Sequence, residues 1–184
     1  MNANDALTLI LRAAHFSADK HRDQRRKGVR ALPYINHPIE VAERLASVGG
    51  VSDARMLAAA ILHDTIEDTE TTAEEISALF GDNVLQLVLE VTDDKRLKKA
   101  ERKRRQIEAA PHKSDCAKQI KLSDKISNVA DMIKNPPDWP ASRKLEYLDW
   151  AEAVALGVGG ANAALDVEFE QTLAAARSQL EDEE

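Results

Sequence analysis

Apolar residues recur at helical spacing along nearly the whole chain, and this pattern predicts an all-α fold of about eight to ten helices. In the first helix, expected over residues 4–22 with Asn4 as its N-cap, the apolar face would contain Leu7, Ile10, Leu11, Ala14 and Ala18. Further helices are expected over residues 37–48, 53–64, 73–80, 83–91, 95–110 and 115–134, with two more after Pro140. No stretch alternates apolar and polar residues over a length that would support a strand.

Capping signals mark where several of these helices begin. Thr72 and Glu75 have the spacing of a capping box at the start of the helix expected over residues 73–80, and Gly81 follows where that helix would end. Other N-caps are expected at Asn36 or His37, at Ser52 and at Ser114.

The stretch from Ile61 to Asp68 carries four side chains that can bind metals or transfer protons, directly after an apolar run. On a helix, His63 would lie one turn before Glu67. Asp64 would likewise lie one turn before Asp68, so two stacked pairs would occupy neighbouring stripes of one surface. A solvated helix end also presents such residues, and the interpretation therefore depends on ligands from other helices.

Two residues elsewhere can supply those ligands. His37 stands at a helix start and can point out of the helix end without disturbing the core. Asp124 falls at the margin of the buried stripe of residues 115–134, where a carboxylate is costly unless a cation pairs with it. The competing interpretation is a surface ion pair with Lys121 or Lys125, which would contribute less than ~1 kcal/mol.

Three predicted helices would together contribute two imidazoles and two carboxylates: His37, His63, Asp64 and Asp124. Such a mixed set suits Mn²⁺, Fe²⁺ or Zn²⁺ better than Mg²⁺, and the lack of thiolates argues against a structural zinc site. A metal ion with open coordination positions polarises a phosphoryl oxygen. Glu67 and Asp68, one turn further on, would steer water and move protons. The residues therefore indicate metal-dependent hydrolysis of a phosphoester.

Composition narrows the class of protein further. A net charge of −7 over 184 residues argues against a general nucleic-acid binder. The single cysteine, Cys116, excludes an intramolecular disulfide and fits a reducing compartment, and no apolar run approaches the ~20 residues of a membrane span. We therefore expect one domain over residues 1–184, with a solvated acidic tail at 181–184, in a cytoplasmic protein that binds neither nucleic acid nor membrane.

Basic residues nevertheless gather in two segments. Residues 20–30 hold six and residues 95–105 hold eight of the 25 Lys and Arg. Each segment could be a solvated charged surface, but a helix with charge nearly all of one sign repels itself, and Glu101 alone would offer little relief. A small anion with several charges is therefore the expected partner.

Five ordered motifs resemble the hydrolase half of the RelA/SpoT family, and most closely its stand-alone small alarmone hydrolases. The motifs are RRK at 25–27, PYINHP at 33–38, HDTIED at 63–68, VTDDK at 91–95 and KLSDKISN at 121–128. The resemblance extends from the first helix to about Trp150. It implies an HD-domain helical bundle that uses one Mn²⁺ ion to remove the 3′-pyrophosphate of guanosine tetra- or pentaphosphate (ppGpp or pppGpp), leaving GDP or GTP.

The resemblance also implies residue roles. It assigns the four ligands above to the Mn²⁺ ion, and Glu67 and Asp68 to catalysis. It places five residues near the nucleotide: Arg26, Lys27, Lys99, Asn128 and Tyr147. Ser123 stands where this family usually has Ala, and its hydroxyl could alter a hydrogen bond to the neighbouring Asp124.

Other functions remain open on the sequence alone. One is a phosphatase acting on a related nucleotide, such as the 2′-phosphate of NADPH. Another is a general nucleotide or cyclic-dinucleotide phosphohydrolase, which the Glu67-Asp68 pair disfavours. A third is a module that binds the alarmone without hydrolysing it, which the intact ligand set disfavours. Self-association into a homo-oligomer is left open.

Overall fold

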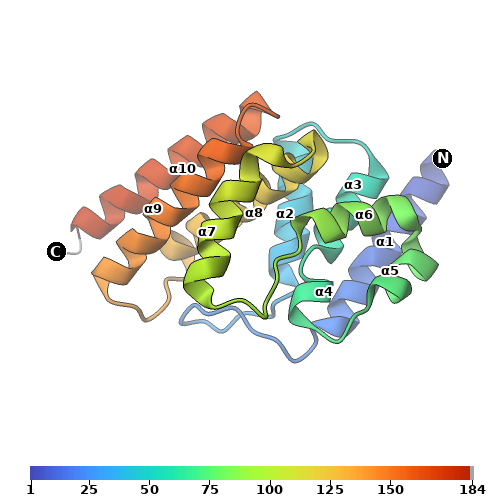
Figure 1. Ribbon diagram of the computed structural model, residues 1–184, viewed down its shortest axis with the longest axis horizontal. Helices are drawn as coiled ribbons and strands as arrows, with labels where there is room; N and C mark the ends of the chain where they lie inside the picture. Colours follow the sequence, from blue (N-terminus) through green and yellow to red (C-terminus); the bar gives the residue numbers. More distant parts are fainter. Residues whose placement is uncertain (183–184) are drawn as a thin grey trace.

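The computed structural model describes residues 1–182, which form α-helices joined by short loops (Figure 1). The helices, in chain order, are α1 (Ala3–Lys20), α2 (Asn36–Ser47), α3 (Ala54–Leu62), α4 (Thr65–Asp68), α5 (Ala73–Phe80), α6 (Asp82–Val91), α7 (Lys99–Ala109), the 3-10 turn η1 (Ala110–His112), α8 (Asp115–Lys134), α9 (Ala141–Val158) and α10 (Ala163–Asp182). In this part of the chain the β-type pairing is confined to isolated bridges, Arg25 with Pro33 and Gly28 with Pro137. The predicted all-α fold is confirmed.

Helix α8 lies at the centre of the molecule. It packs against α9 and α10, which run side by side along one end of the molecule in Figure 1, and also against α2 and α6. Helix α3 packs in turn against α1, α2 and α6 at the other end. Contacts between α2 and α8 therefore join the two groups of helices, and polar residues on those two helices lie deep in the protein.

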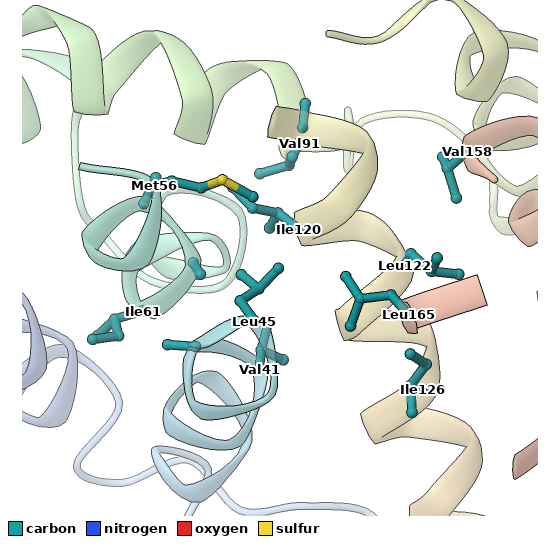
Figure 2. Packing of buried hydrophobic residues seen from close by; sticks show 14 of the residues in the cluster. Val41, Leu45, Met56, Ile61, Val91, Ile120, Leu122, Ile126, Val158 and Leu165 are labelled. Carbon is teal, nitrogen blue, oxygen red and sulfur yellow. The ribbon is translucent and has the colours of Figure 1, made fainter. Parts of the chain in front are cut away.

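Buried apolar side chains fix the helices around this junction. Figure 2 shows Ile120 of α8 between Leu45 of α2 and Met56 of α3, with Val41 one turn before Leu45 on α2. Burying one such side chain stabilises the fold by about 1.5–3 kcal/mol relative to leaving it exposed. Because each helix contributes several, α2, α3 and α8 form a rigid frame for the polar residues that they carry.

The first helix differs from the prediction in its cap and in its buried face. The N-cap is Asn2, whose side chain forms a capping box with Asp5, rather than Asn4. Of the predicted face, Leu7, Leu11 and Ala18 are exposed. Small residues on another side of α1, Ala13 and Ser17, are fully buried, because they let α1 approach the alanine-rich α3 closely.

Other helix ends were predicted with mixed success. The capping box of α5 and the Ser114 cap of α8 are confirmed. The cap of α3 is Asp53 rather than Ser52, and α2 begins without a side-chain cap. Of the predicted acidic tail, residues 181–182 belong to α10, and residues 183–184 lie outside the described residues. No described helix is long and apolar enough to span a membrane.

Candidate active site

A break in the helix at His63 and Asp64 turns both side chains into the interior. Helix α3 ends at Leu62 and α4 begins at Thr65, whereas the sequence pattern predicted one continuous helix. Both intervening residues keep right-handed backbone angles, with φ −56° and ψ −33° at His63 and φ −97° and ψ −4° at Asp64. The Thr65 hydroxyl donates to the Leu62 carbonyl at 2.7 Å, which satisfies an acceptor that the break leaves free.

Four side chains converge next to this break. The ligand atoms of His37, His63 and Asp124, all buried, lie within 4.8 Å of one another. His37 Nε2 is 3.2 Å from Asp124 Oδ1 and 3.7 Å from Asp64 Oδ2. His63 Nε2 is 3.0 Å from Asp64 Oδ2 and 3.9 Å from Asp124 Oδ1. Donors bonded to one ion at about 2.0–2.2 Å stand roughly 3–4 Å apart, so this arrangement fits a divalent metal ion.

The protonation of His63 also fits a metal ion. His63 Nδ1 lies 2.7 Å from the Ala60 carbonyl oxygen, which can only accept, so Nδ1 carries a proton. Nε2 is buried and faces Asp64 Oδ2 at 3.0 Å, and it offers a lone pair to a metal ion once it has lost its own proton. Burial, the largest influence, lowers the pKa of His63, but the charges of Asp64 and Asp124 outweigh it and raise the pKa to about 9. The centre therefore attracts a cation strongly.

The carboxylates of Asp64 and Asp124 are both held by further side chains. The Tyr34 hydroxyl donates to Asp64 Oδ2 at 2.6 Å. Asp124 accepts from Asn128 Nδ2 at 2.5 Å through Oδ1 and from Lys125 Nζ at 2.7 Å through Oδ2. Burial raises the pKa of Asp124, but the charge of Lys125 and the bond with His37 hold it well below its usual range. The Asp124–Lys125 pair predicted as the competing interpretation exists, but it is buried and orients the carboxylate instead of lying in water.

The hydroxyl beside Asp124 does not contact this ligand. Ser123 donates to the Val41 carbonyl at 2.9 Å and thereby joins α8 to α2. The hydrogen bond behind a ligand comes from Ser127, one turn further along α8, which lies 3.0 Å from His37 Nδ1. The hydrogen bond next to the proposed ligands therefore comes from Ser127 and not, as the sequence suggested, from Ser123.

The two acidic residues beyond the break have different surroundings. Glu67 is largely buried, and its Oε2 accepts from the Asp93 backbone N–H at 3.0 Å. Burial, followed by the charges of Asp93 and Asp64, raises the pKa of Glu67 to about 7. Asp68 instead accepts from Gln24 Nε2 at 3.1 Å and pairs with Lys95. Glu67 is therefore suited to exchange protons near neutral pH, whereas Asp68 is held among polar partners.

A cavity of about 240 Å³ adjoins the four converging side chains. Its wall includes four of the five residues predicted to bind substrate: Arg26, Lys27, Asn128 and Tyr147. Tyr34 and Asp68 also line it and connect it to the candidate metal centre. The loop between α1 and α2 contributes three cations to this wall, Arg25, Arg26 and Lys27.

Arg26 and Lys99, two of the predicted substrate-binding cations, differ in their relation to the cavity. Arg26 donates from Nε to Asp131 at 2.8 Å and from one terminal nitrogen to Asn128 at 2.9 Å, so its guanidinium is fixed at the cavity wall. Lys99, the first residue of α7, is absent from the cavity wall. Its charge still reaches Lys27, whose pKa is lowered by burial and then by Lys99.

Sequence reasoning missed several residues of this site. Tyr34 lies inside a motif that was noted, but only the fold brings its hydroxyl to Asp64. Trp139 lies in the proline-rich connector and showed no sequence signal, yet it lines the cavity and its ring is tilted toward Tyr147, with ring centroids 6.0 Å apart. Ser127 could not be separated from other small residues of α8 by pattern alone.

The chain is a member of the HD-domain family, whose model matches residues 13–148. MESH1 of Xenopus tropicalis is 52% identical over 159 residues, which cover 86% of this chain and 89% of the relative. Human MESH1 is 51% identical over 158 residues, which cover 85% and 88%. Both relatives are named guanosine-3′,5′-bis(diphosphate) 3′-pyrophosphohydrolase. A solved metazoan SpoT orthologue, described as hydrolysing ppGpp, is 42% identical, covers 91% of this chain and 94% of its own, and superposes with a TM-score of 0.88. Within the HD-domain proteins, this chain belongs to the MESH1 family.

Proposed function

We propose that this protein is a metal-dependent hydrolase that converts ppGpp or pppGpp to GDP or GTP and releases pyrophosphate. The observation that carries the proposal is the convergence of two imidazoles and two carboxylates beside a cavity whose wall includes Arg25, Arg26 and Lys27. The relatives that match most of the chain bear the name of this activity. No comparison favours the 2′-phosphate of NADPH as the substrate.

His37, His63, Asp64 and Asp124 would hold the metal ion, for which we propose Mn²⁺ because imidazole and carboxylate ligands suit it. When bound, such an ion polarises a phosphoryl oxygen and lowers the pKa of a coordinated water from 15.7 to about 7. The chain's own contribution is to fix the ligands in advance, since hydrogen bonds on α2, α3 and α8 orient them.

Hydrolysis adds the oxygen of water to the phosphorus next to the ribose and breaks the bond from that phosphorus to the 3′ oxygen. The attacking water loses a proton, and the departing 3′ oxygen gains one. Glu67, with its raised pKa, is placed to accept the proton of the water. Asp68, held by Gln24 and Lys95 at the cavity wall, would orient the water and exchange protons with it.

The basic residues would offset the charge of the pyrophosphate. Arg26 and Lys27 lie at the cavity wall, and Lys99 adds its charge from α7. Asn128 and Tyr147, on the same wall, would contact the nucleoside. The free cysteine Cys116 supports a cytoplasmic location.

Turnover of the purified protein tests this proposal. With ppGpp and Mn²⁺ we expect GDP and pyrophosphate in equal amounts, and no turnover after chelation. Parallel assays with NADPH would measure orthophosphate. Release of orthophosphate from NADPH at a higher kcat/KM than pyrophosphate from ppGpp would favour the alternative substrate, and unchanged ppGpp with Mn²⁺ bound would refute the hydrolase.

A further inference from the structure

The imidazole of His37 has a second polar contact on the side away from the candidate metal centre. His37 Nδ1 lies 3.0 Å from the hydroxyl oxygen of Ser127, and the Ser127 hydroxyl lies 2.9 Å from Glu40 Oε2. His37 and Ser127 are buried, with 2% and 0% of their surface exposed. A buried hydrogen-bonded chain thus leads from the centre, across the α2–α8 contact, to a carboxylate.

The direction of the protons along this chain follows from the donors available. An ionised carboxylate only accepts, so the single hydroxyl proton of Ser127 goes to Glu40. The serine oxygen then presents a lone pair to His37, so Nδ1 must carry a proton and donate this hydrogen bond. This leaves the lone pair of the neutral imidazole on Nε2, the atom 3.2 Å from Asp124.

Glu40 is itself held in place. Its other oxygen, Oε1, lies 3.4 Å from a terminal nitrogen of Arg44, one turn along α2. Arg44 is buried and is anchored by Glu168 of α10 at 2.9 Å. The carboxylate that accepts from Ser127 is therefore fixed by three helices, α2, α8 and α10.

We infer that Ser127 and Glu40 are positioning residues that select the metal-binding tautomer of His37 and hold its ring toward the centre. The other imidazole, His63, receives the same help from a backbone carbonyl, which no side-chain replacement removes. For His37 the help comes from side chains alone, and it can be removed without touching a ligand. The inference rests on the proposed metal site, and partners of this kind typically change metal affinity by about 10- to 100-fold.

The chain offers a matched control for Ser127. Ser123 is a fully buried serine on the same helix, one turn before Ser127, and it also donates to α2, but to a backbone carbonyl. We expect Ser127→Ala to weaken Mn²⁺ binding to the chelated protein about 10- to 100-fold by calorimetry without substrate. Ser123→Ala should bind within about threefold of wild type while losing comparable thermal stability. Equal Mn²⁺ affinity in the two variants would overturn the inference.

Glu40 is tested in the same way against Glu43, an exposed acid on the same helix. Glu40→Ala should weaken Mn²⁺ binding, and Glu43→Ala, with the same change in charge, should not. If Ser127→Ala weakened Mn²⁺ binding and Glu40→Ala did not, the role of Glu40 in the hydrogen-bonded chain would be overturned. If the wild-type protein did not bind Mn²⁺ at all, the proposed metal site would be refuted, and the positioning roles of Ser127 and Glu40 with it.

A spectroscopic measurement separates positioning from packing. In the diamagnetic Zn²⁺-loaded protein, nitrogen-15 NMR should show a slowly exchanging proton on His37 Nδ1 in wild type and in Ser123→Ala. The same signal should exchange rapidly in Ser127→Ala, because its acceptor is gone. An unprotonated Nδ1 in the wild type would overturn the proton assignment.

Discussion

At the scale of single residues, the His63 imidazole is fixed by a backbone carbonyl on one side and faces two carboxylates on the other. Replacing it with Ala removes one of two nitrogen ligands, and we expect His63→Ala to reduce Mn²⁺ affinity at least 100-fold in a calorimetric titration. His15→Ala is the matched control, because His15 is exposed on α1. Full Mn²⁺ binding by the His63 variant would remove His63 from the ligand set.

Glu67 is not one of the four proposed metal ligands, and its carboxylate accepts a hydrogen bond from the Asp93 backbone N–H. Glu67→Gln keeps the size of the side chain but removes its capacity to accept a proton. We expect kcat for ppGpp to fall about 10²- to 10⁴-fold, the usual contribution of a general base, with Mn²⁺ affinity unchanged. Glu70→Gln, at an exposed position three residues later, should leave kcat unchanged. Wild-type kcat in Glu67→Gln would exclude Glu67 from catalysis.

The raised pKa of Glu67 also predicts a pH dependence. A base works only when ionised, and Glu67, whose pKa is about 7, is protonated below that pH. Activity should therefore fall about tenfold per pH unit on the acid side, and a bound cation shifts this fall to somewhat lower pH. The measurement is kcat as a function of pH, and saturation of the protein with Mn²⁺ is confirmed at each pH. An identical acid limb in Glu67→Gln would show that another group causes it.

At the scale of elements, helix α7 is attached to the protein without a fully buried side. It has no fully buried residue, and it packs against α9 and η1. Gln106 donates to Asp93 at 2.5 Å, and the Trp150 indole donates to the Lys103 carbonyl at 3.3 Å. Its positive charge is less one-sided than expected, because Arg104 and Arg105 pair with Glu101. Substrate charge therefore has fewer free cations to engage than the sequence suggested.

Lys99 is the cation of α7 for which we predict a role in substrate binding. Its charge acts on Lys27 at the cavity wall. Lys99→Ala should raise KM for ppGpp about tenfold, the lower end for a lost charge-assisted contact, while kcat and Mn²⁺ affinity stay constant. Arg104→Ala removes the same charge from a residue already paired on the outer face and should change KM little. Similar KM values in both variants would assign the effect to net charge alone.

The sequence predicted best those elements that are determined locally. Helices α5 and α8 were placed nearly to the residue, since caps at Thr72 and Ser114 act within one turn. The buried face of α1 was only partly right, because tertiary packing decided it: Ile10 and Ala14 pack against the core as predicted, but the fully buried residues are the small Ala13 and Ser17, and Leu7 is exposed. The break after Leu62 was missed as well. The Thr65 hydroxyl bonds only three residues back, but threonine also makes such local bonds inside continuous helices, as Thr172 does in α10, so the residue type alone did not mark the break.

At the scale of the whole molecule, the four proposed ligands connect both groups of helices. His37 comes from α2, His63 and Asp64 from the α3–α4 break, and Asp124 from α8. The ligand types could be inferred from the sequence, since histidine and carboxylate stood beside predicted apolar faces. The pairing of Asp124 with its neighbour Lys125 was foreseen, but the Tyr34 and Ser127 contacts could not be, because they depend on how the helices pack.

This arrangement predicts that metal stabilises the fold as a whole. The carboxylates of Asp64 and Asp124 both lie against the two imidazoles at the centre, and a cation that binds only the folded state offsets the repulsion between these carboxylates. At a free Mn²⁺ concentration 100 times Kd, the stabilisation is about 2.7 kcal/mol. For a chain of this size that corresponds to a rise in Tm of roughly 5–10 °C. Differential scanning calorimetry of chelated and Mn²⁺-loaded protein measures it. His63→Ala should show no such rise, and an unchanged Tm in the wild type with Mn²⁺ demonstrably bound would mean that the ion does not hold the two groups of helices together.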